Sequence, residues 1–490
     1  MEQHSISLLE KLPLHLLFLI GDCLVQLQPR TRRSIFALSL TSKTCNLATD
    51  PERFRHVHLA LVGPQKLQCD IQRWRQILQA GDRLAFVRSV KITGVTVSSS
   101  VEEELIKNGD PSGTKMSLIQ MENARDNFGW NVDVDEEAAG LFSGLDRVTN
   151  ANYRLPAPST AWPDESAWKP LADLMKDIPA LRDVIFTSRD QFPRLLLSEL
   201  HEHHPHCRLH MHCFKLRSMI LPERAEQKVH PDDIALATSP CLYSIVVQTQ
   251  PYDSAQTLDY NLEAVMAMTK GLAPNLKNVS LTEGVHQAVP GSFSTIPRPQ
   301  WKGFQVPAGK LNVTESAIGR LENLVLNYSL SGEQLLEWSS CTDFCHLRSM
   351  KAGPGFGVSA VRTLAEAARK TPLSALSSLN LKLTPHYSFG ETDEMIDPAV
   401  AELLQSLYPL EVLELDGHIG EKSFEAIITH HTKLLRKLTF ICQDSEAEIF
   451  DFTSERATQL SRECLNIQML DVRGPKVLES NSFSDWEDWS

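Results

Sequence analysis

Residues 410–415 read LEVLEL, with apolar residues at the first, fourth and sixth positions. The pattern recurs, with Val, Ile, Met or Phe also allowed, in segments that begin at Leu181, Leu242, Leu276, Leu321, Leu347, Leu376, Leu435 and Ile467. A weaker copy, HCRLHM, begins at His206, and an outlying copy, VRSVKI, begins at Val87. Apolar residues at alternate positions are typical of a short strand with one buried face. The sequence therefore predicts a series of short strands along most of the chain.

The segments between these strands have helical spacing, because their apolar residues recur every three or four positions. The clearest are residues 166–179, 257–274, 331–340, 358–372, 397–409, 423–435 and 454–465. Several open on Ser or Asp, which are favoured N-cap residues, and stop before Pro179, Pro274, Pro372 or Pro409. The repeating unit is thus a strand, a loop, a helix and a second loop.

This unit resembles the leucine-rich repeat. The resemblance covers residues 181–473, and its repetition makes it more specific than any single match. It implies an α/β fold in which residues 166–475 form an irregular solenoid, with parallel strands on the concave face and helices on the convex face. Within each strand, the residues between the apolar positions are expected to face outward on the concave side.

Residues 8–60 differ from the repeats and predict two or three short helices. They contain Leu12-Pro13, an apolar stripe of Leu16, Leu17 and Ile20, the segment LSLTSK at residues 38–43 and the ending DPERFRHVHL at residues 50–59. Together these features resemble an F-box, although His15 and Cys45 depart from the common pattern. The resemblance implies a small, all-helical N-terminal domain.

An F-box followed by leucine-rich repeats is similar in layout to the substrate-recognition subunits of Skp-cullin-F-box ubiquitin ligases, which are cullin-RING enzymes. The resemblance implies that the F-box docks on the Skp adaptor, the adaptor sits on a cullin, and the solenoid binds a client protein. Such a chain contributes proximity and is not itself an enzyme. The residues expected to contact the adaptor are Leu12, Pro13, Leu16, Leu17, Ile20, Leu24, Leu38 and Lys43. The client-binding candidates are His210, His212, Lys351, Asn380, Glu414 and Asp471.

The same residues have other interpretations. The N-terminal stripe also fits an amphipathic helix that only caps a leucine-rich-repeat scaffold with no role in ubiquitin transfer. A further alternative is a hydrolase or transferase whose catalytic residues are dispersed along the chain. The sequence gives no positive evidence for it, because it contains no G-x-S-x-G, GxxxxGK[ST], HExxH or CxxC motif. A segment with mixed polar, acidic and proline-rich stretches, residues 61–165, is expected to connect the two parts or to contribute the first solenoid turns. Residues 476–490 form an acidic tail with two tryptophans.

Residues 201–214, HEHHPHCRLHMHCF, raise the question of a metal site. His203, Cys207, His212 and Cys213 have the residue types of zinc ligands. If CRLHMHC is a strand, however, Leu209, Met211 and Cys213 share the buried face, and His210 and His212 face the opposite way. We therefore expect residues 201–205 to finish a helix with His201 and His204 exposed, His210 and His212 to lie on the concave face, and no metal to be bound.

Gly353, Gly355 and Gly357 lie between a predicted strand and a predicted helix, as in a dinucleotide-binding loop. Val358 stands where that motif has its third glycine, and the segment also fits the ordinary strand-to-helix loop of a repeat. We therefore expect no nucleotide or other cofactor at this loop.

The composition limits the remaining classes of function. Apolar residues make up 42% of the 490 residues, and the net charge is −13, which argues against binding to nucleic acid. The apolar run near the N-terminus is interrupted by Pro13, His15 and Asp22 and predicts neither a signal peptide nor a membrane span. Ten scattered cysteines without a dense framework are typical of a reducing, intracellular compartment, cytoplasmic or nuclear.

Overall fold

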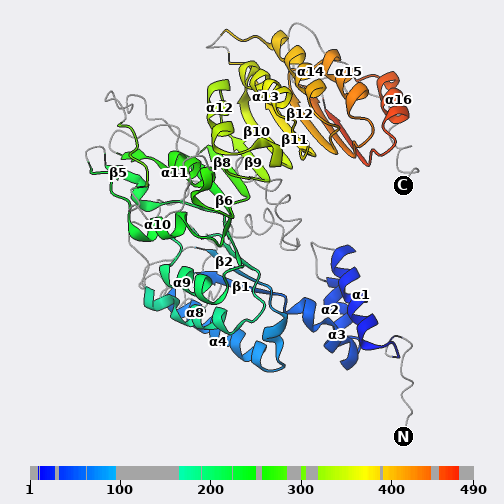
Figure 1. The fold of residues 1–490 in the computed structure, drawn as a ribbon. Coiled ribbons are helices and arrows are strands. Elements are labelled where there is room, and N and C mark those ends of the chain that lie inside the picture. The colour runs from blue at the N-terminus through cyan, green and yellow to red at the C-terminus, as the bar shows by residue number, and fades with distance from the viewer. Residues whose placement is uncertain are drawn as a thin grey trace, which may run out of the picture. The chain divides into compact units, whose positions relative to one another are not determined.

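The structure is a computed structural model, and it describes residues 9, 11–27, 33–61, 63–94, 165–188, 190–222, 225–249, 257–283, 299–304, 318–386, 390–442 and 452–473. The chain divides into two compact units (Figure 1). The first comprises Met1–Met268, Leu272–Leu276 and Gly284–Asn312. The second comprises Thr269–Gly271, Lys277–Glu283 and Val313–Ser490.

The first unit begins with a cluster of three helices. These are α1 (Leu14–Leu27), α2 (Arg33–Ser39) and α3 (Lys43–Arg53). The side chain of Ser42 caps α3 by accepting a hydrogen bond from the backbone N–H of Cys45 at 3.1 Å. This helical start agrees with the prediction for the N-terminal residues.

A parallel sheet follows the helices in the first unit, in the strand order β1-β2-β3-β4-β6. Its strands are β1 (His56–Leu61), β2 (Ser89–Gly94), β3 (Asp183–Phe186), β4 (Arg208–Met211) and β6 (Leu242–Thr249). The accompanying helices are α4 (Pro64–Gln79), the short η1 (Arg83–Phe86), η2 (Glu165–Trp168), α8 (Lys169–Asp177), α9 (Arg194–His203), η3 (Arg217–Met219), α10 (Pro231–Ala237) and α11 (Asn261–Ala267). A separate antiparallel pair, which the sequence did not predict, joins β5 (Ile220–Pro222) to β7 (Thr257–Asp259).

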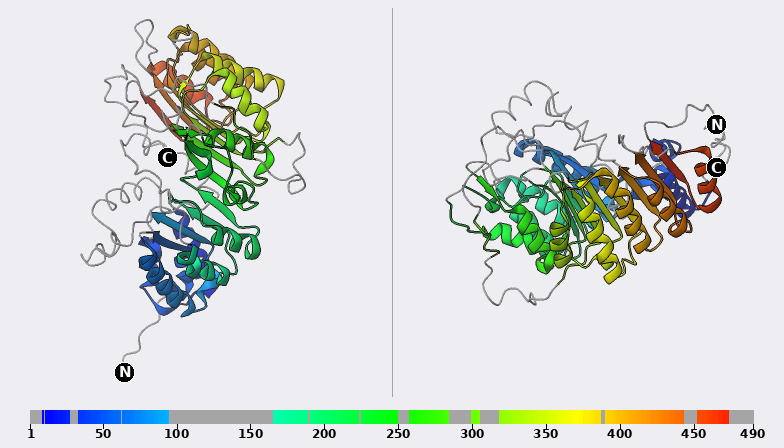
Figure 2. Two further views of the ribbon diagram at one scale, coloured as in Figure 1. Left: turned by 90° about the vertical axis from the view of Figure 1, so that its left-hand side faces the viewer. Right: turned by 90° about the horizontal axis from the view of Figure 1, so that it is seen from above.

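The second unit alternates strands and helices more regularly. Its parallel strands, in the order β8-β9-β10-β11-β12-β13-β14, are β8 (Asn278–Glu283), β9 (Asn323–Asn327), β10 (Ser349–Phe356), β11 (Ser378–Leu383), β12 (Val412–Gly417), β13 (Lys437–Cys442) and β14 (Met469–Arg473). The short η4 (Met268–Leu272) precedes β8 and contributes Thr269–Gly271 to this unit. The elements between the strands include α12 (Gly332–Cys341), η5 (Phe344–His346), α13 (Val358–Lys370), η7 (Asp393–Met395), α14 (Ile396–Ser406), α15 (Glu421–His430) and α16 (Ser454–Glu463). Figure 2 shows these α-helices side by side along one face of the strands.

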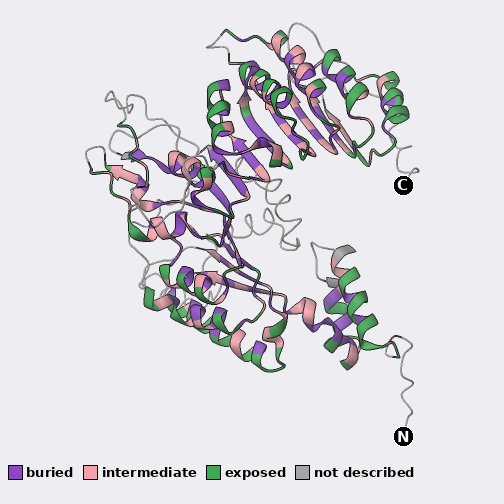
Figure 3. Cartoon of the chain, in the orientation of Figure 1, coloured by how far each residue is buried: buried purple, intermediate pink, exposed green. Residues whose placement is uncertain are grey.

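The register of the second unit aligns the apolar residues of successive strands. Leu379 pairs with Leu413, which pairs with Leu438, and the first two of these side chains are fully buried. Ser378, Asn380 and other residues between these positions are only half-buried and lie on the sheet face opposite the helices, called the front face below. Figure 3 shows the buried residues concentrated in the strands and on one side of each helix. Burial of the strand leucines against the helices is the main stabilising contribution of each repeat.

The predicted α/β class with parallel strands is confirmed, and each repeat segment from Val87 to Ile467 contains or adjoins an observed strand. To the parallel strands the structure adds β1, because residues 56–61 pair with β2 although they were predicted to end the helical N-terminal domain. Of the predicted connecting region, the described part contributes α4 and β2 to the first unit. The acidic and proline-rich loops predicted between residues 95 and 164 and the tail at 476–490 lie outside the described residues.

Candidate functional site

Two surfaces are candidates for binding a partner, and the first is formed by α1, α2 and α3. The core of this helical cluster consists of Leu17, Leu38, Cys45 and Ala48, with exposed fractions between 0% and 8%. Leu9, Leu12, Ile20 and Leu24 pack against it and are partly buried. Of the eight residues predicted to contact an adaptor, Leu17 and Leu38 therefore hold the helices together and offer almost no surface, whereas Pro13, Leu16 and Lys43 are exposed.

The helices also expose apolar side chains that the prediction omitted. These are Leu14, Phe18, Leu19, Phe36, Leu40 and Leu47. Leu40 is 87% exposed, and Leu19 and Leu47 are each 57% exposed. A sequence signal for this surface exists, since residues 16–20 are all apolar and consecutive helical residues are separated by about 100° around the axis. Five such neighbours cannot share one buried face, so some must be exposed.

A charged and aromatic junction connects α3 to η1. The buried carboxylate of Asp50 pairs with Arg53 at 3.3 Å and with Arg83 at 3.1 Å. The guanidinium of Arg83 also lies 4.4 Å from the ring centroid of Phe54, within the range of a cation–π interaction. These contacts attach the helical cluster through α3, and they leave the apolar residues of α1 and α2 exposed.

The second candidate surface is the front face of the sheet in the second unit. Lys351, Asn380, Glu414, Thr439 and Asp471 are successive partners across β10 to β14 and therefore form one row. This register agrees with the predicted placement of four client-binding candidates. Asn380, Glu414 and Asp471 are half-buried, but Lys351 is only 6% exposed, so its prediction as an exposed client contact is wrong.

Polar groups of the row interact with neighbouring strands. The carboxylate of Glu414 accepts hydrogen bonds from the Asn380 amide and, at 2.5 Å, from the Lys437 ammonium. Asp471 accepts a hydrogen bond from Arg473 at 2.6 Å. The row thus has paired charges of both signs, which suits polar contact with another macromolecule but contains no pairing of nucleophile and base.

In the first unit His210 of β4 and His212, which follows the end of β4, are not exposed as predicted. Leu209 and Met211 are buried as expected, but His210 is only 1% exposed and His212 only 8%. The Nε2 of His210 lies 3.2 Å from the Asp183 carboxylate, and Arg208 donates two further hydrogen bonds to that carboxylate at 2.7 and 3.2 Å. Both histidines do lie opposite the leucine side of the strand, but strand alternation does not determine whether the other face is exposed.

Burial and neighbouring charges shift the pKa values of Asp183 and His212. Burial would raise the pKa of the Asp183 carboxyl, but the hydrogen bonds and charges of His210 and Arg208 outweigh this effect and lower it. Burial holds the pKa of His212 well below its usual value, with smaller contributions from the charges of Lys91 and His210. The His212 ring is therefore neutral at physiological pH.

The remaining predictions for residues 201–214 have mixed outcomes. The helix α9 ends at His203, close to the predicted end. His204, predicted to be exposed, is buried and contacts the Met175 carbonyl oxygen at 2.8 Å, while His201 is half-buried and contacts Ser239 Oγ at 2.8 Å. Cys213 lies beyond the end of β4 and is half-buried. Within the described ranges, no group of three or more His, Cys, Asp or Glu side chains is arranged to hold a metal ion.

Two of the three glycines predicted to lie in a loop, Gly353 and Gly355, are part of β10, and the connection at Gly357 is occupied by a side chain of the protein itself. Glu391 accepts hydrogen bonds from the backbone N–H groups of Val358 at 2.9 Å and Ser359 at 2.8 Å, at the start of α13. A Cβ atom at Gly357 would collide with Glu391 and His386. Because the carboxylate takes the position that a phosphate would need, the structure offers no space for a dinucleotide at this helix terminus.

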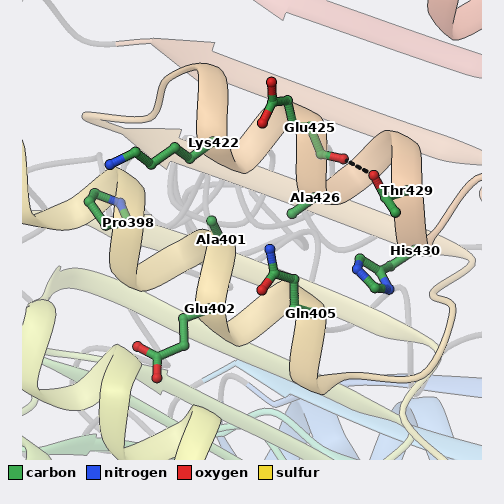
Figure 4. Close-up of a pocket in the computed structure, with 9 residues that line it drawn as sticks. All are labelled: Pro398, Ala401, Glu402, Gln405, Lys422, Glu425, Ala426, Thr429 and His430. Carbon is green, nitrogen blue, oxygen red and sulfur yellow. Dashed lines mark hydrogen bonds between the residues drawn. The ribbon is translucent and has the colours of Figure 1, made fainter.

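The described part of the chain also contains two surface depressions. One, of about 330 Å³, lies between α14 and α15 (Figure 4) and is lined by Pro398, Ala401, Glu402, Gln405, Lys422, Glu425, Ala426, Thr429 and His430. The other, of about 350 Å³, lies between α4 and α8. In Figure 4 the small side chains of Ala401 and Ala426 face each other between the helices, and the charged side chains surround them. This first depression contains no cysteine or serine next to a base.

No helix in the described ranges is both long enough and apolar enough to cross a lipid bilayer. Comparison with protein-family models and with curated proteins found no match to this chain.

Proposed function

We propose that this chain is the substrate-recognition subunit of a Skp-cullin-F-box ubiquitin ligase. In this proposal α1, α2 and α3 dock on the Skp adaptor, and the front face of the sheet binds a client protein. The observation that carries the proposal is the set of exposed apolar side chains on a small helical cluster that has its own buried core. Several large apolar side chains left exposed on one small helical cluster favour a protein-binding role for it.

The exposure of these residues favours a partner over a solenoid cap. A cap would bury its apolar side chains against the adjoining sheet, yet Leu16 of the predicted stripe is 38% exposed, and Leu19 and Leu40, outside the stripe, are 57% and 87% exposed. Burying one leucine side chain is worth about 1.5–3 kcal/mol. A partner that covers several of them at once would therefore gain substantial binding free energy.

The front face of the second unit supports the client-binding part of the proposal. Asn380, Glu414 and Asp471 come from different strands but lie in one row, so a single partner can contact all three. Holding a client beside the ubiquitin-charged conjugating enzyme of the assembly raises the effective concentration of the client's lysines. The chain needs no catalytic residues for this role.

The first experiment measures binding of the full chain to purified Skp adaptor by pull-down and calorimetry. Leu16→Asp and Leu19→Asp are expected to weaken binding about tenfold or more, since each places a charge in an apolar interface. Leu336→Asp is the matched control, because Leu336 on α12 is 56% exposed and lies outside the helical cluster. Circular dichroism of each variant verifies that the fold is retained.

Two outcomes would overturn the adaptor part of the proposal. One is failure of the unaltered chain to bind under conditions in which a known F-box protein binds. The other is equal weakening by the α12 control and the α1 variants. Crosslinking of the chain in cells, followed by mass spectrometry, identifies the client. If the client binds the front face, the Glu414→Lys variant is expected to lose these crosslinks and the Glu333→Lys variant to keep them.

A further inference from the structure

The last strand of the second unit, β14, is less buried than the strand before it, β13. The residues on its helix side, Leu470 and Val472, are only half-buried, whereas Leu438 and Phe440 at the corresponding positions of β13 are each 1% exposed. Met469, the first residue of β14, is 54% exposed, and Leu465, four residues before it, is 85% exposed. An uncovered terminal strand with exposed apolar neighbours is a template for pairing with another strand.

The first strand of the sheet in the other unit is a useful contrast. The helix-side residues of β1 are Val57, Leu59 and Leu61, and none is more than 1% exposed. A terminal strand of this protein can therefore be fully covered by its own unit. The half-buried residues of β14 are a local feature of that strand.

Among the described residues, β14 has a strand partner on one edge only. The N–H of Met469 donates to the carbonyl of Arg436 at 3.1 Å, and Met469 pairs with Lys437 of β13. Because alternate residues of a parallel strand bond to the same neighbour, Asp471 and Arg473 also point their backbone groups toward β13. The N–H and C=O groups of Leu470 and Val472 therefore point to the opposite edge, where the described part of the chain places no further strand.

The charges on β14 match a second copy of the same strand. Asp471 and Arg473 lie on the front face, with side chains 28% and 68% exposed. In a two-fold antiparallel pair centred on Val472, the two Val472 residues face each other as a hydrogen-bonded pair. Asp471 then lies opposite the partner's Arg473, and Arg473 opposite the partner's Asp471, in the more closely spaced non-hydrogen-bonded positions. A register centred on Asp471 would instead place two carboxylates opposite each other.

We propose that the edge of β14 is a dimerisation surface, at which two copies of this chain pair antiparallel in the register centred on Val472. Each Asp471 carboxylate then lies between its own Arg473 and the partner's Arg473. The pairing satisfies the outward backbone groups of Val472 and covers its half-exposed side chain. The pairing does not involve the adaptor-binding helices, but it shares Asp471 with the front-face row proposed to bind the client.

A charge exchange tests this register in the full chain, with the dimer dissociation constant measured by analytical ultracentrifugation over a range of concentrations. Asp471→Arg places arginines opposite each other and is expected to weaken the dimer about tenfold. The double variant Asp471→Arg/Arg473→Asp restores opposite charges in the same register and is expected to restore dimerisation. Glu333→Arg, an exposed change on α12, is the matched control for net charge.

Three results would overturn the proposal. The unaltered chain could remain a monomer up to about 100 μM, which would mean a dissociation constant too high for a specific dimer. The double variant could be as weak as the single variant, which would exclude the register. Deletion of residues 476–490 could convert a monomer into a dimer, which would mean that this segment, and not a second copy, covers the edge.

Discussion

The carboxylate of Asp397, on α14, accepts a hydrogen bond from the backbone N–H of Gly420 at 2.8 Å. Gly420 is the N-cap residue of α15, and glycine has no side chain with which to cap the helix. The same carboxylate also accepts hydrogen bonds from the N–H groups of Lys422 and Ser423 at 3.1 and 3.0 Å. One repeat thus caps the helix of the next, which couples their stability.

Replacement of this carboxylate is expected to destabilise the second unit. Asp397→Ala leaves the first turn of α15 without its acceptor and is expected to lower the free energy of unfolding by about 1–2 kcal/mol. Asp397→Asn keeps one acceptor oxygen and should cost less. Urea denaturation at neutral pH measures both, with the exposed Glu425→Gln on α15 as the control. An Ala variant that unfolds at the same urea concentration as the unaltered chain would show that the cap contributes nothing.

Glu391 caps α13 in a similar way and makes stability depend on pH. Burial would raise the pKa of its carboxyl, but hydrogen bonds from the N–H groups of His386, Ser359 and Val358 lower it below the usual value. In the unfolded chain the pKa of this carboxyl is near 4.3, and in the folded protein it is lower. The carboxylate therefore stabilises the fold above the unfolded pKa, and this stabilisation is lost as the pH falls through the folded pKa. Glu391→Gln is therefore expected to lower the melting temperature at pH 7 and to have a smaller effect at pH 3. An equal effect at both pH values would contradict this assignment.

The strands of the fold were predictable because their signal is local. In β11 and β12, apolar residues alternate with polar ones, and the alternation directly specifies which residues face the helices. The strand β1 was missed because its histidines alternate with Val57, Leu59 and Leu61 inside a segment that resembles an F-box ending. The same apolar residues fit both the ending of an F-box and a strand, so the sequence pattern does not distinguish between the two.

The burial of the candidate site residues was not predictable in the same way. Alternation places His210 and Lys351 opposite the leucine side, but their exposure depends on contacts with residues distant in the sequence, such as the Asp183 carboxylate that binds His210. The division of the N-terminal stripe into core and surface likewise depends on how three helices pack. Leu17 and Leu19 are the same type of residue, and only the packing of the three helices makes one buried and the other exposed.

Acidification is expected to destabilise the second unit through His431. Its Nδ1 accepts a hydrogen bond from the N–H of Leu410 at 3.2 Å, and its Nε2–H donates to the Leu404 carbonyl at 3.0 Å. Burial lowers the pKa of His431 from 6.5 to about 4. Between these two pH values the unfolded chain binds the proton and the folded chain does not, so stability is present above pH 6.5 and falls as the pH decreases toward 4.

The size of this effect is about 3 kcal/mol, from the difference between the two pKa values. The imidazole resonance of His431, followed by NMR, should titrate near pH 4. His431→Gln should show a shallower loss of stability between pH 6.5 and 4 than the unaltered chain. The exposed Leu434→Gln, which leaves every titratable group in place, is the control and should keep the slope of the unaltered chain. Equal slopes for both variants would mean that other groups cause the acid sensitivity.

Leu17 and Leu19 provide a test that separates the core of the helical cluster from its surface. Leu17 is fully buried, so Leu17→Ala is expected to cost about 2–5 kcal/mol. Leu19 is 57% exposed, so Leu19→Ala should change stability by less than about 0.5 kcal/mol. Hydrogen exchange of α1, α2 and α3 in the full chain measures both effects. If Leu19→Ala releases exchange protection as strongly as Leu17→Ala, the exposed apolar surface belongs to the folded core and cannot be a docking site.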